Sequence, residues 1–165
     1  MLYPSQKSLK DIPALQRPLR AVDGYLYLGM PEEALGALAD VPVERHLDAP
    51  VMRARICILL HLGQWARANR LAEQGTQLHP DENEFVVQRA FALHQLNKGG
   101  EAIQVIEEAP AWIRRTGILH YNLACYEAKL GDLSTARQCI RAAIELNSAF
   151  RKSARHDPDL QKLWN

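Results

Sequence analysis

The sequence predicts an all-α fold of four helix–turn–helix repeats, and three observations at one spacing support it. A leucine recurs every 34 residues, at Leu28, Leu62, Leu96 and Leu130. A turn-forming residue follows each leucine, at Gly29, Gly63, Asn97 and Gly131. An alanine recurs at the same interval, at Ala34, Ala68, Ala102 and Ala136. A fixed period of this length is typical of stacked-repeat proteins, which carry their function on an extended surface.

The period divides the chain into an N-terminal extension, four repeats and a closing segment. The extension covers residues 1–14, the repeats cover 15–48, 49–82, 83–116 and 117–150, and the closing segment covers 151–165. In the fourth repeat a helical stripe of apolar residues consists of Leu119, Leu123, Tyr126 and Leu130. Gly131 suits the left-handed conformation that ends a helix, and Asp132 suits the N-cap of the next one.

Prolines and acidic residues predict where other helices begin and end. Pro31 suits the first turn of the second helix of repeat one. Asp81, with Glu84 three residues later, predicts a capping box at the start of repeat three. Pro42 and Pro110 occupy equivalent places in repeats one and three, and proline disfavours helix for the residue before it. We therefore expect shorter second helices in these two repeats than in repeats two and four.

The closing segment is predicted to be structural. Residues 149–156 can continue as a helix, and Asp157-Pro158 then opens a short final helix. One face of this final helix carries Leu160, Leu163 and Trp164. A repeat stack needs an end piece because its last repeat has no neighbour. We expect the segment to cover the last long helix around Ile140 and Ile144, while Trp164 either seals the stack or anchors a partner.

The composition argues against several functional classes. Hydrophobic residues make up 47% and charged residues 24%, which is an ordinary globular balance. The formal net charge of +1 gives no whole-molecule attraction to nucleic acid or to an anionic membrane. No apolar run has the length of a membrane span, and the first 14 residues lack the apolar core of a signal peptide. Three cysteines are a sparse and odd set, which predicts a reduced, cytoplasmic setting.

These features resemble the tetratricopeptide repeat family, whose unit is a 34-residue helix–turn–helix. The fourth repeat follows the family pattern at Leu123-Ala124, Ala136, Ile140 and Ala143. The second repeat follows it at Leu59, Ala68, Ala72, Gly75 and Pro80, whereas the first and third keep little beyond the turn leucine and the alanine. The early tryptophan of the family is replaced by Pro18, Met52, Val86 and His120. The resemblance covers residues 15–150 and implies a right-handed superhelical solenoid.

The resemblance also implies a concave groove, lined by the first helix of each repeat, that holds an extended or helical peptide. Transferred to this chain, the lining residues are Leu19, Asp23, Leu26 and Tyr27 of repeat one; Arg53, Cys57, Leu60 and His61 of repeat two; Val87, Gln88, Phe91, His94 and Gln95 of repeat three; and Tyr121, Asn122, Cys125 and Lys129 of repeat four. An alternative is that about half of them pack against neighbouring helices. Because aromatic side chains give large contact area, Phe91 is the expected main anchor.

One subgroup of the family grips a terminal carboxylate with paired cationic side chains, and this chain lacks that pattern. The matching places hold Leu19, Asp23, Ala54, Glu84 and Gln88, and one repeat later they hold Arg53, Cys57, Gln88, Ile118 and Asn122. Neither set supplies the paired cations that a carboxylate requires. The sequence therefore argues against that class of ligand.

A metal site or a catalytic site would have to use the cysteine and histidine residues of the predicted groove. Cys57 and His61 stand one helical turn apart, with His94 in the next repeat, and these are residue types that bind zinc. No fourth ligand is evident, and no carboxylate is placed to orient a Cys–His pair. Phosphate-binding loops and serine nucleophile motifs are also missing from the sequence. We therefore expect no metal, no cofactor and no catalysis.

The expected function is that of a non-enzymatic adaptor or scaffold that binds a protein or peptide segment in its groove. Two alternatives stay open: a dedicated chaperone for one secreted or assembling client, and a structural module that self-associates through an end face. The basic clusters Arg114-Arg115 and Arg151-Lys152-Arg155-His156 are short and span no face of several repeats, so a nucleic-acid partner is not expected. The sequence does not identify the partner.

Overall fold

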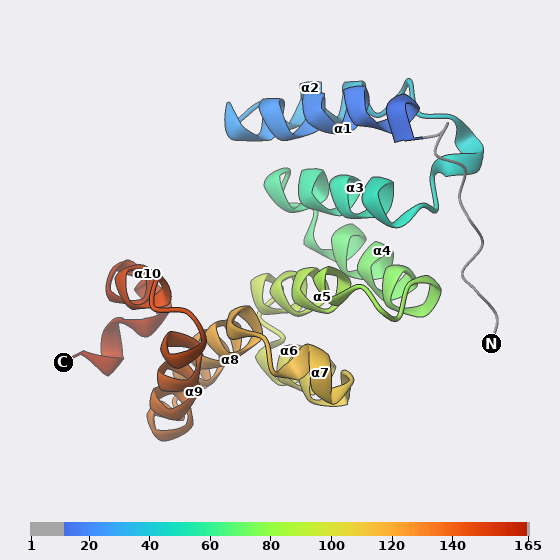
Figure 1. The fold of residues 1–165 in the computed structure, drawn as a ribbon. Coiled ribbons are helices and arrows are strands. Elements are labelled where there is room, and N and C mark those ends of the chain that lie inside the picture. Colours follow the sequence, from blue (N-terminus) through green and yellow to red (C-terminus); the bar gives the residue numbers. More distant parts are fainter. Residues whose placement is uncertain (1–11, 165) are drawn as a thin grey trace. The chain divides into compact units, whose positions relative to one another are not determined.

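The computed structural model describes residues 12–164 of the chain. Within this range it contains ten α-helices and two short 3-10 helices, and no strand (Figure 1). The predicted all-α helical repeat fold is therefore confirmed. The predicted N-terminal extension lies outside the described residues except for its last three, which begin the first helix.

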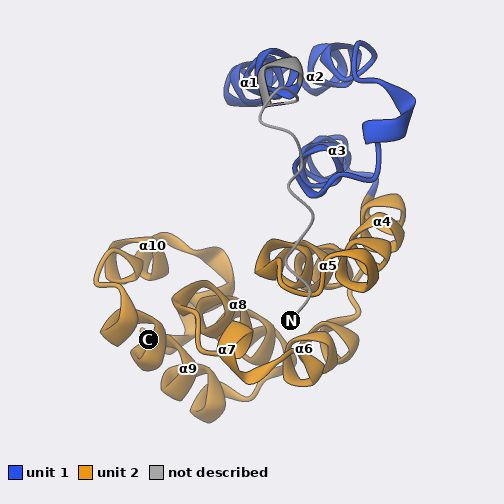
Figure 2. Cartoon of the chain, turned by 45° about the vertical axis from the view of Figure 1, so that its right-hand side comes forward, with its two compact units in different colours: residues 1–64 blue, residues 65–165 orange. Residues whose placement is uncertain are grey.

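The chain forms two compact units, which are divided between Gln64 and Trp65 (Figure 2). The first unit contains α1 (Ile12–Tyr27), α2 (Pro31–Ala37), η1 (Val43–Arg45) and α3 (Ala49–His61). Its three α-helices contact one another around a core that includes Val22, Ala34 and Ile58. The boundary falls at the turn of the predicted second repeat, so the two helices of that repeat belong to different units.

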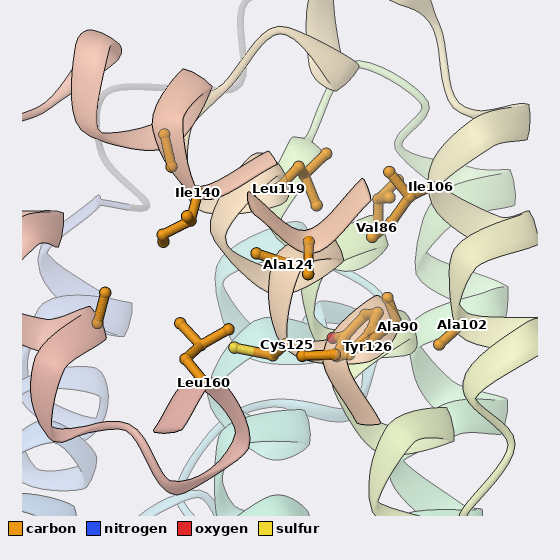
Figure 3. Packing of buried hydrophobic residues seen from close by; sticks show 14 of the residues in the cluster. Val86, Ala90, Ala102, Ile106, Leu119, Ala124, Cys125, Tyr126, Ile140 and Leu160 are labelled. Carbon is orange, nitrogen blue, oxygen red and sulfur yellow. The ribbon is translucent and has the colours of Figure 1, made fainter. Parts of the chain in front are cut away.

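The second unit contains the remaining helices. They are α4 (Trp65–Leu78), α5 (Asn83–Gln95), α6 (Gly99–Glu108), α7 (Ala111–Arg114), α8 (Gly117–Leu130), α9 (Leu133–Leu146), α10 (Phe150–His156) and η2 (Pro158–Leu163). Helix α5 packs against α4, α6 and α8, and α8 also packs against α9. Figure 3 shows the core between these helices, where Val86 of α5 and Ile106 of α6 lie near Leu119 of α8.

The four residues that follow the periodic leucines adopt the turn conformation that the sequence predicts. The backbone φ angle is 71° at Gly29, 67° at Gly63, 59° at Asn97 and 98° at Gly131. Glycine adopts this left-handed region without steric cost, and asparagine is among the few other residues that tolerate it. The four periodic alanines, Ala34, Ala68, Ala102 and Ala136, are all fully buried.

Helix lengths follow the predicted effect of the two prolines. Helix α2 has 7 residues and α6 has 10, whereas α4 and α9 have 14 each. Pro42 and Pro110 stand at the N-caps of η1 and α7. Helix α6 ends at Glu108, with its C-cap directly before Pro110, whereas α2 already ends at Ala37, several residues before Pro42. The expectation of shorter second helices in repeats one and three is confirmed.

Of the features predicted at the helix ends, the Asp132 cap is present and the Asp81 capping box is not. Asp132 caps α9, since its Oδ1 accepts a hydrogen bond from the Thr135 backbone N–H at 2.9 Å. The predicted capping box at Asp81 is wrong, because the N-cap of α5 is Glu82 and its side chain makes no cap hydrogen bond. Leu130 is also not part of the core stripe, since it stands at the end of α8 and is 58% exposed.

The closing segment folds as α10 and η2, and η2 packs against α8, α9 and α10. Asp157 caps η2, because its Oδ1 accepts a hydrogen bond from the Asp159 backbone N–H at 3.0 Å. Leu160 and Leu163 are buried as predicted. Trp164 is 48% exposed, so the predicted apolar face is only partly covered.

Candidate functional site

The predicted groove residues differ widely in exposure. The exposed ones are Asp23, Tyr27, His61, Phe91, Gln95 and Lys129. The half-buried ones are Leu19, Leu26, Arg53, Cys57, Leu60, Val87, Gln88, Tyr121 and Asn122. Two of them, His94 and Cys125, are buried.

In the second unit, one face of α5 presents an aromatic side chain between polar ones. Phe91 is 38% exposed, Gln95 is exposed one turn further on, and Val87 and Gln88 are half-buried one turn before. Trp65 of α4 meets the Phe91 ring edge-on, with 6.3 Å between the ring centroids and 77° between the planes. This contact holds the Phe91 ring in place while part of it stays open to solvent.

On α8 the corresponding face is occupied by the closing segment of the same chain. The Tyr121 hydroxyl donates a hydrogen bond to Asp157 Oδ2 at 2.7 Å. The Cys125 thiol points to the same oxygen, with 3.7 Å between Sγ and Oδ2. The Tyr121 ring also packs against Phe150 of α10, with 5.2 Å between centroids. Tyr121 and Cys125 therefore bind the chain's own C-terminal segment.

His94 of α5 belongs to the same cluster. Its Nε2 lies 3.0 Å from Asp159 Oδ2, and its ring stacks on Tyr126 with 4.5 Å between centroids. Only 3% of His94 is exposed, because Tyr126 covers its ring. The sequence places His94 in the groove but does not indicate Asp159, which is distant along the chain and only two residues after Asp157. The two aspartates together bind α5 and α8.

Burial and nearby carboxylates keep the Cys125 thiol and the Tyr121 hydroxyl protonated. Burial raises the pKa of the Cys125 thiol, and the negative charges of Asp157 and Asp159 raise it further. Burial also raises the pKa of the Tyr121 hydroxyl, as does its hydrogen bond to Asp157. Both groups are therefore neutral hydrogen-bond donors near pH 7. A neutral, buried thiol is a poor nucleophile, which argues against a catalytic role for Cys125.

The residues that suggested zinc do not form a metal site within residues 12–164. No group of three potential ligands among His, Cys, Asp and Glu is found in that range. His61 Nδ1 lies 2.8 Å from the backbone oxygen of Cys57, one turn earlier on α3, so the ring donates this hydrogen bond. His94, the third residue of the suggested set, is held by Asp159. Both of these residues belong to the second unit, whereas Cys57 and His61 belong to the first.

The helix pairs, left-handed turns and buried alanines define a helical-repeat protein with a tetratricopeptide-like fold. No family model and no curated protein matches the chain. Among solved structures, the chain is similar to MamA 41-end from Desulfovibrio magneticus RS-1, with a TM-score of 0.68 and 20% sequence identity. The match covers 88% of this chain and 81% of that one. At this identity the likeness shows the fold alone.

No helix within the described range combines the length and the apolar character that a membrane span requires.

Proposed function

We propose that the chain is a non-enzymatic protein-interaction module that binds a segment of another protein along the exposed face of α5. The observation that supports this is the partly exposed Phe91 ring, held edge-on by Trp65. Large aromatic side chains are enriched among the residues that contribute most to protein–protein binding. Helical-repeat proteins use such surfaces rather than enclosed pockets.

A polar neighbour of Phe91 suits the recognition of a polypeptide. Gln95 is exposed one helical turn after Phe91, so the two side chains share one face of α5. An amide side chain both donates and accepts hydrogen bonds, as a peptide backbone requires. We infer that Phe91 supplies contact area and that Gln95 fixes the position of the bound segment.

The closing segment gives a second line of support. Helix α8 is the counterpart of α5 in the next predicted repeat. Its equivalent side already binds a polypeptide segment, which is the chain's own residues 157–163. This contact shows that the side chains there satisfy a polypeptide with hydrogen bonds and apolar contacts. It also restricts the proposed site, because Tyr121, Cys125 and His94 are engaged and the available face is that of α5.

The proposal is tested with a partner recovered from the native cell lysate and titrated calorimetrically against variants. Phe91→Ala should weaken binding by at least about 1 kcal/mol, because it removes the anchor. Trp112→Ala is the matched control, since Trp112 is an aromatic residue with 53% exposure on α7. Melting curves of both variants separate lost binding from lost folding. Full affinity in Phe91→Ala, with reduced affinity in Trp112→Ala, would contradict the proposal.

A second candidate function, self-association, is favoured by exposed apolar residues at the α1–α2 turn of the first unit. Tyr27 is 92% exposed, Leu28 67% and Met30 36%. Neighbouring exposed apolar side chains of this size are typical of a protein contact. Sedimentation at two concentrations tests it: the parent should gain mass with concentration, and Tyr27→Ser/Leu28→Ser should not. A parent that is monomeric at both concentrations contradicts this candidate.

The dedicated-chaperone alternative and the cytoplasmic setting stay predictions.

A further inference from the structure

A cleft at the C-terminal end of the second unit is unrelated to the α5 face. It has a volume of about 380 Å³, within the range of roughly 300–1,000 Å³ that ligand sites occupy. Its apolar lining consists of Ile140 and Ile144 of α9 and Leu163 of η2, with the half-exposed Trp164 beside them. The Trp164 indole N–H donates a hydrogen bond to the Ala154 backbone oxygen at 3.1 Å, which fixes the indole in place.

Four arginines surround this apolar lining, in two pairs at one-turn spacing. Arg137 and Arg141 lie on α9, and Arg151 and Arg155 lie on α10. Arg137 donates a hydrogen bond from Nη1 to the Leu163 backbone oxygen at 2.5 Å.

The guanidinium groups of the other three arginines, Arg141, Arg151 and Arg155, form no hydrogen bond or ion pair with any described residue. Among the described residues that line the cleft, Glu145 is the one that carries a carboxylate.

Concentrated positive charge without partners is unfavourable in the free protein, because like charges at this spacing repel one another. A bound anionic group would relieve the repulsion and accept the guanidinium hydrogen bonds, often two from one arginine. The accessible apolar surface of the cleft comes from the half-buried Ile144 and from Trp164, since Ile140 and Leu163 are only 3% and 2% exposed. A ligand that carries carboxylates on both sides of an apolar stripe would satisfy both the guanidinium groups and this apolar surface.

We propose that this cleft binds an acidic amphipathic helix of a partner protein. Leucine-like side chains at positions i and i+4 of that helix lie on Ile144 and on the exposed part of Trp164. Glutamates or aspartates on the two flanks pair with Arg141 on one side and with Arg151 and Arg155 on the other. This is the helix-in-groove mode of peptide recognition, with charge complementarity setting the orientation.

A nucleic-acid ligand fits the cleft less well than an acidic helix. Single-stranded nucleic acid needs aromatic platforms for several successive bases, and the cleft offers one indole beside three aliphatic side chains. The basic residues are confined to α9 and α10, and the net charge of the chain is only +1.

The test uses a fluorescein-labelled 14-residue peptide with leucines along one helical face and glutamates on both flanks. Binding to the full-length chain is followed by fluorescence anisotropy at low and at physiological ionic strength. The comparison peptide carries lysine in place of every glutamate. The test variant is Arg141→Glu/Arg155→Glu, and the matched control is Arg70→Glu, which reverses one exposed arginine on α4.

The proposal predicts that the glutamate peptide binds at least 10-fold more tightly than the lysine peptide. The Arg141→Glu/Arg155→Glu variant should lose at least 10-fold in affinity, and Arg70→Glu should change it less than 2-fold. The Arg141→Glu/Arg155→Glu variant should fold like the parent, because both arginines are exposed and their guanidinium groups pair with no described residue, and equal melting curves verify this.

Three results would overturn the proposal. One is equal binding of the two peptides. Another is an equal loss in the Arg70→Glu control, which would indicate non-specific attraction. The third is tighter binding of a 20-nucleotide single-stranded RNA that the same charge reversal abolishes, which would assign the cleft to nucleic acid.

Discussion

Gly75 of α4 allows a neighbouring aromatic ring to come close to the helix backbone. An added Cβ at this position would lie 2.7 Å from Cγ of Phe85, which is fully buried and stacks on His79. Elsewhere in a helix, replacing glycine by alanine stabilises by up to about 1 kcal/mol. Here the absent side chain makes room for the Phe85 ring, so the residue is needed for packing.

We therefore predict that Gly75→Ala lowers the free energy of unfolding by about 1–3 kcal/mol, because overpacking exceeds the gain in helix propensity. Gly100→Ala in α6 is the control, since a Cβ there meets no atom within 4 Å. Urea unfolding of both variants measures the difference. A Gly75→Ala protein as stable as the parent would show that Phe85 moves aside freely.

Asp132 links the stability of α9 to pH. The hydrogen bonds that its carboxylate accepts from Thr135 lower its pKa. Because the pKa of Asp132 is lower in the folded state than in the unfolded state, the ionised carboxylate stabilises the fold. This stabilisation is fully present above the unfolded-state pKa, about 3.9 for aspartate, and it is lost as the pH falls through the folded-state pKa. We predict that Asp132→Ala melts at a lower temperature than the parent at pH 7 and that this difference shrinks below about pH 3.9. A difference that stays constant across this range would contradict the assigned cap.

At the scale of the helices, one buried alanine per repeat sets how closely paired helices approach. Ala68 is fully buried in α4, which packs against α5. A leucine there must displace its neighbours, so Ala68→Leu should destabilise by about 1–3 kcal/mol. Ala66→Leu, at an exposed position of the same helix, should change stability by less than about 0.5 kcal/mol. Equal urea midpoints for the two variants would show that the alanine contact is not tight.

The closing segment packs against the second unit through buried side chains. Leu160 of η2 is fully buried among residues of the second unit, so Leu160→Ala should lower stability by about 2–5 kcal/mol. Gln161→Ala is the matched control, because Gln161 is the exposed neighbour in the same short helix. Chemical denaturation measures both. If Leu160→Ala unfolded at the parent's midpoint, the segment would not be docked in solution as it is in the structure.

Local features of the elements could be read from the sequence because they depend on residues close together in the chain. The turn conformations follow from Gly29, Gly63, Asn97 and Gly131, and the early end of α6 follows from Pro110. Asp81 failed as a cap because the capping pattern fixes a helix start only to within a residue or two, and the helix begins after Glu82.

At the scale of the whole molecule, contacts between distant segments could not be read in this way. His94 and Asp159 are separated by 65 residues, and no periodic pattern relates them. The resemblance therefore placed His94, Tyr121 and Cys125 in a groove, whereas the structure engages them with the chain's own Asp157 and Asp159. The division between Gln64 and Trp65 was equally hidden, because the 34-residue period continues across it without a gap. The four-repeat domain boundaries stay a prediction.

The central claim is that a partner protein binds the exposed face of α5, and site-specific photo-crosslinking tests it most directly. A benzoylphenylalanine replaces Gln95 on that face or, as the control, Gln138 on the exposed side of α9. With the partner recovered from the lysate, the account predicts a covalent adduct from position 95 that excess unlabelled parent chain suppresses, and no such adduct from position 138. An adduct from position 138 with none from position 95 would contradict it.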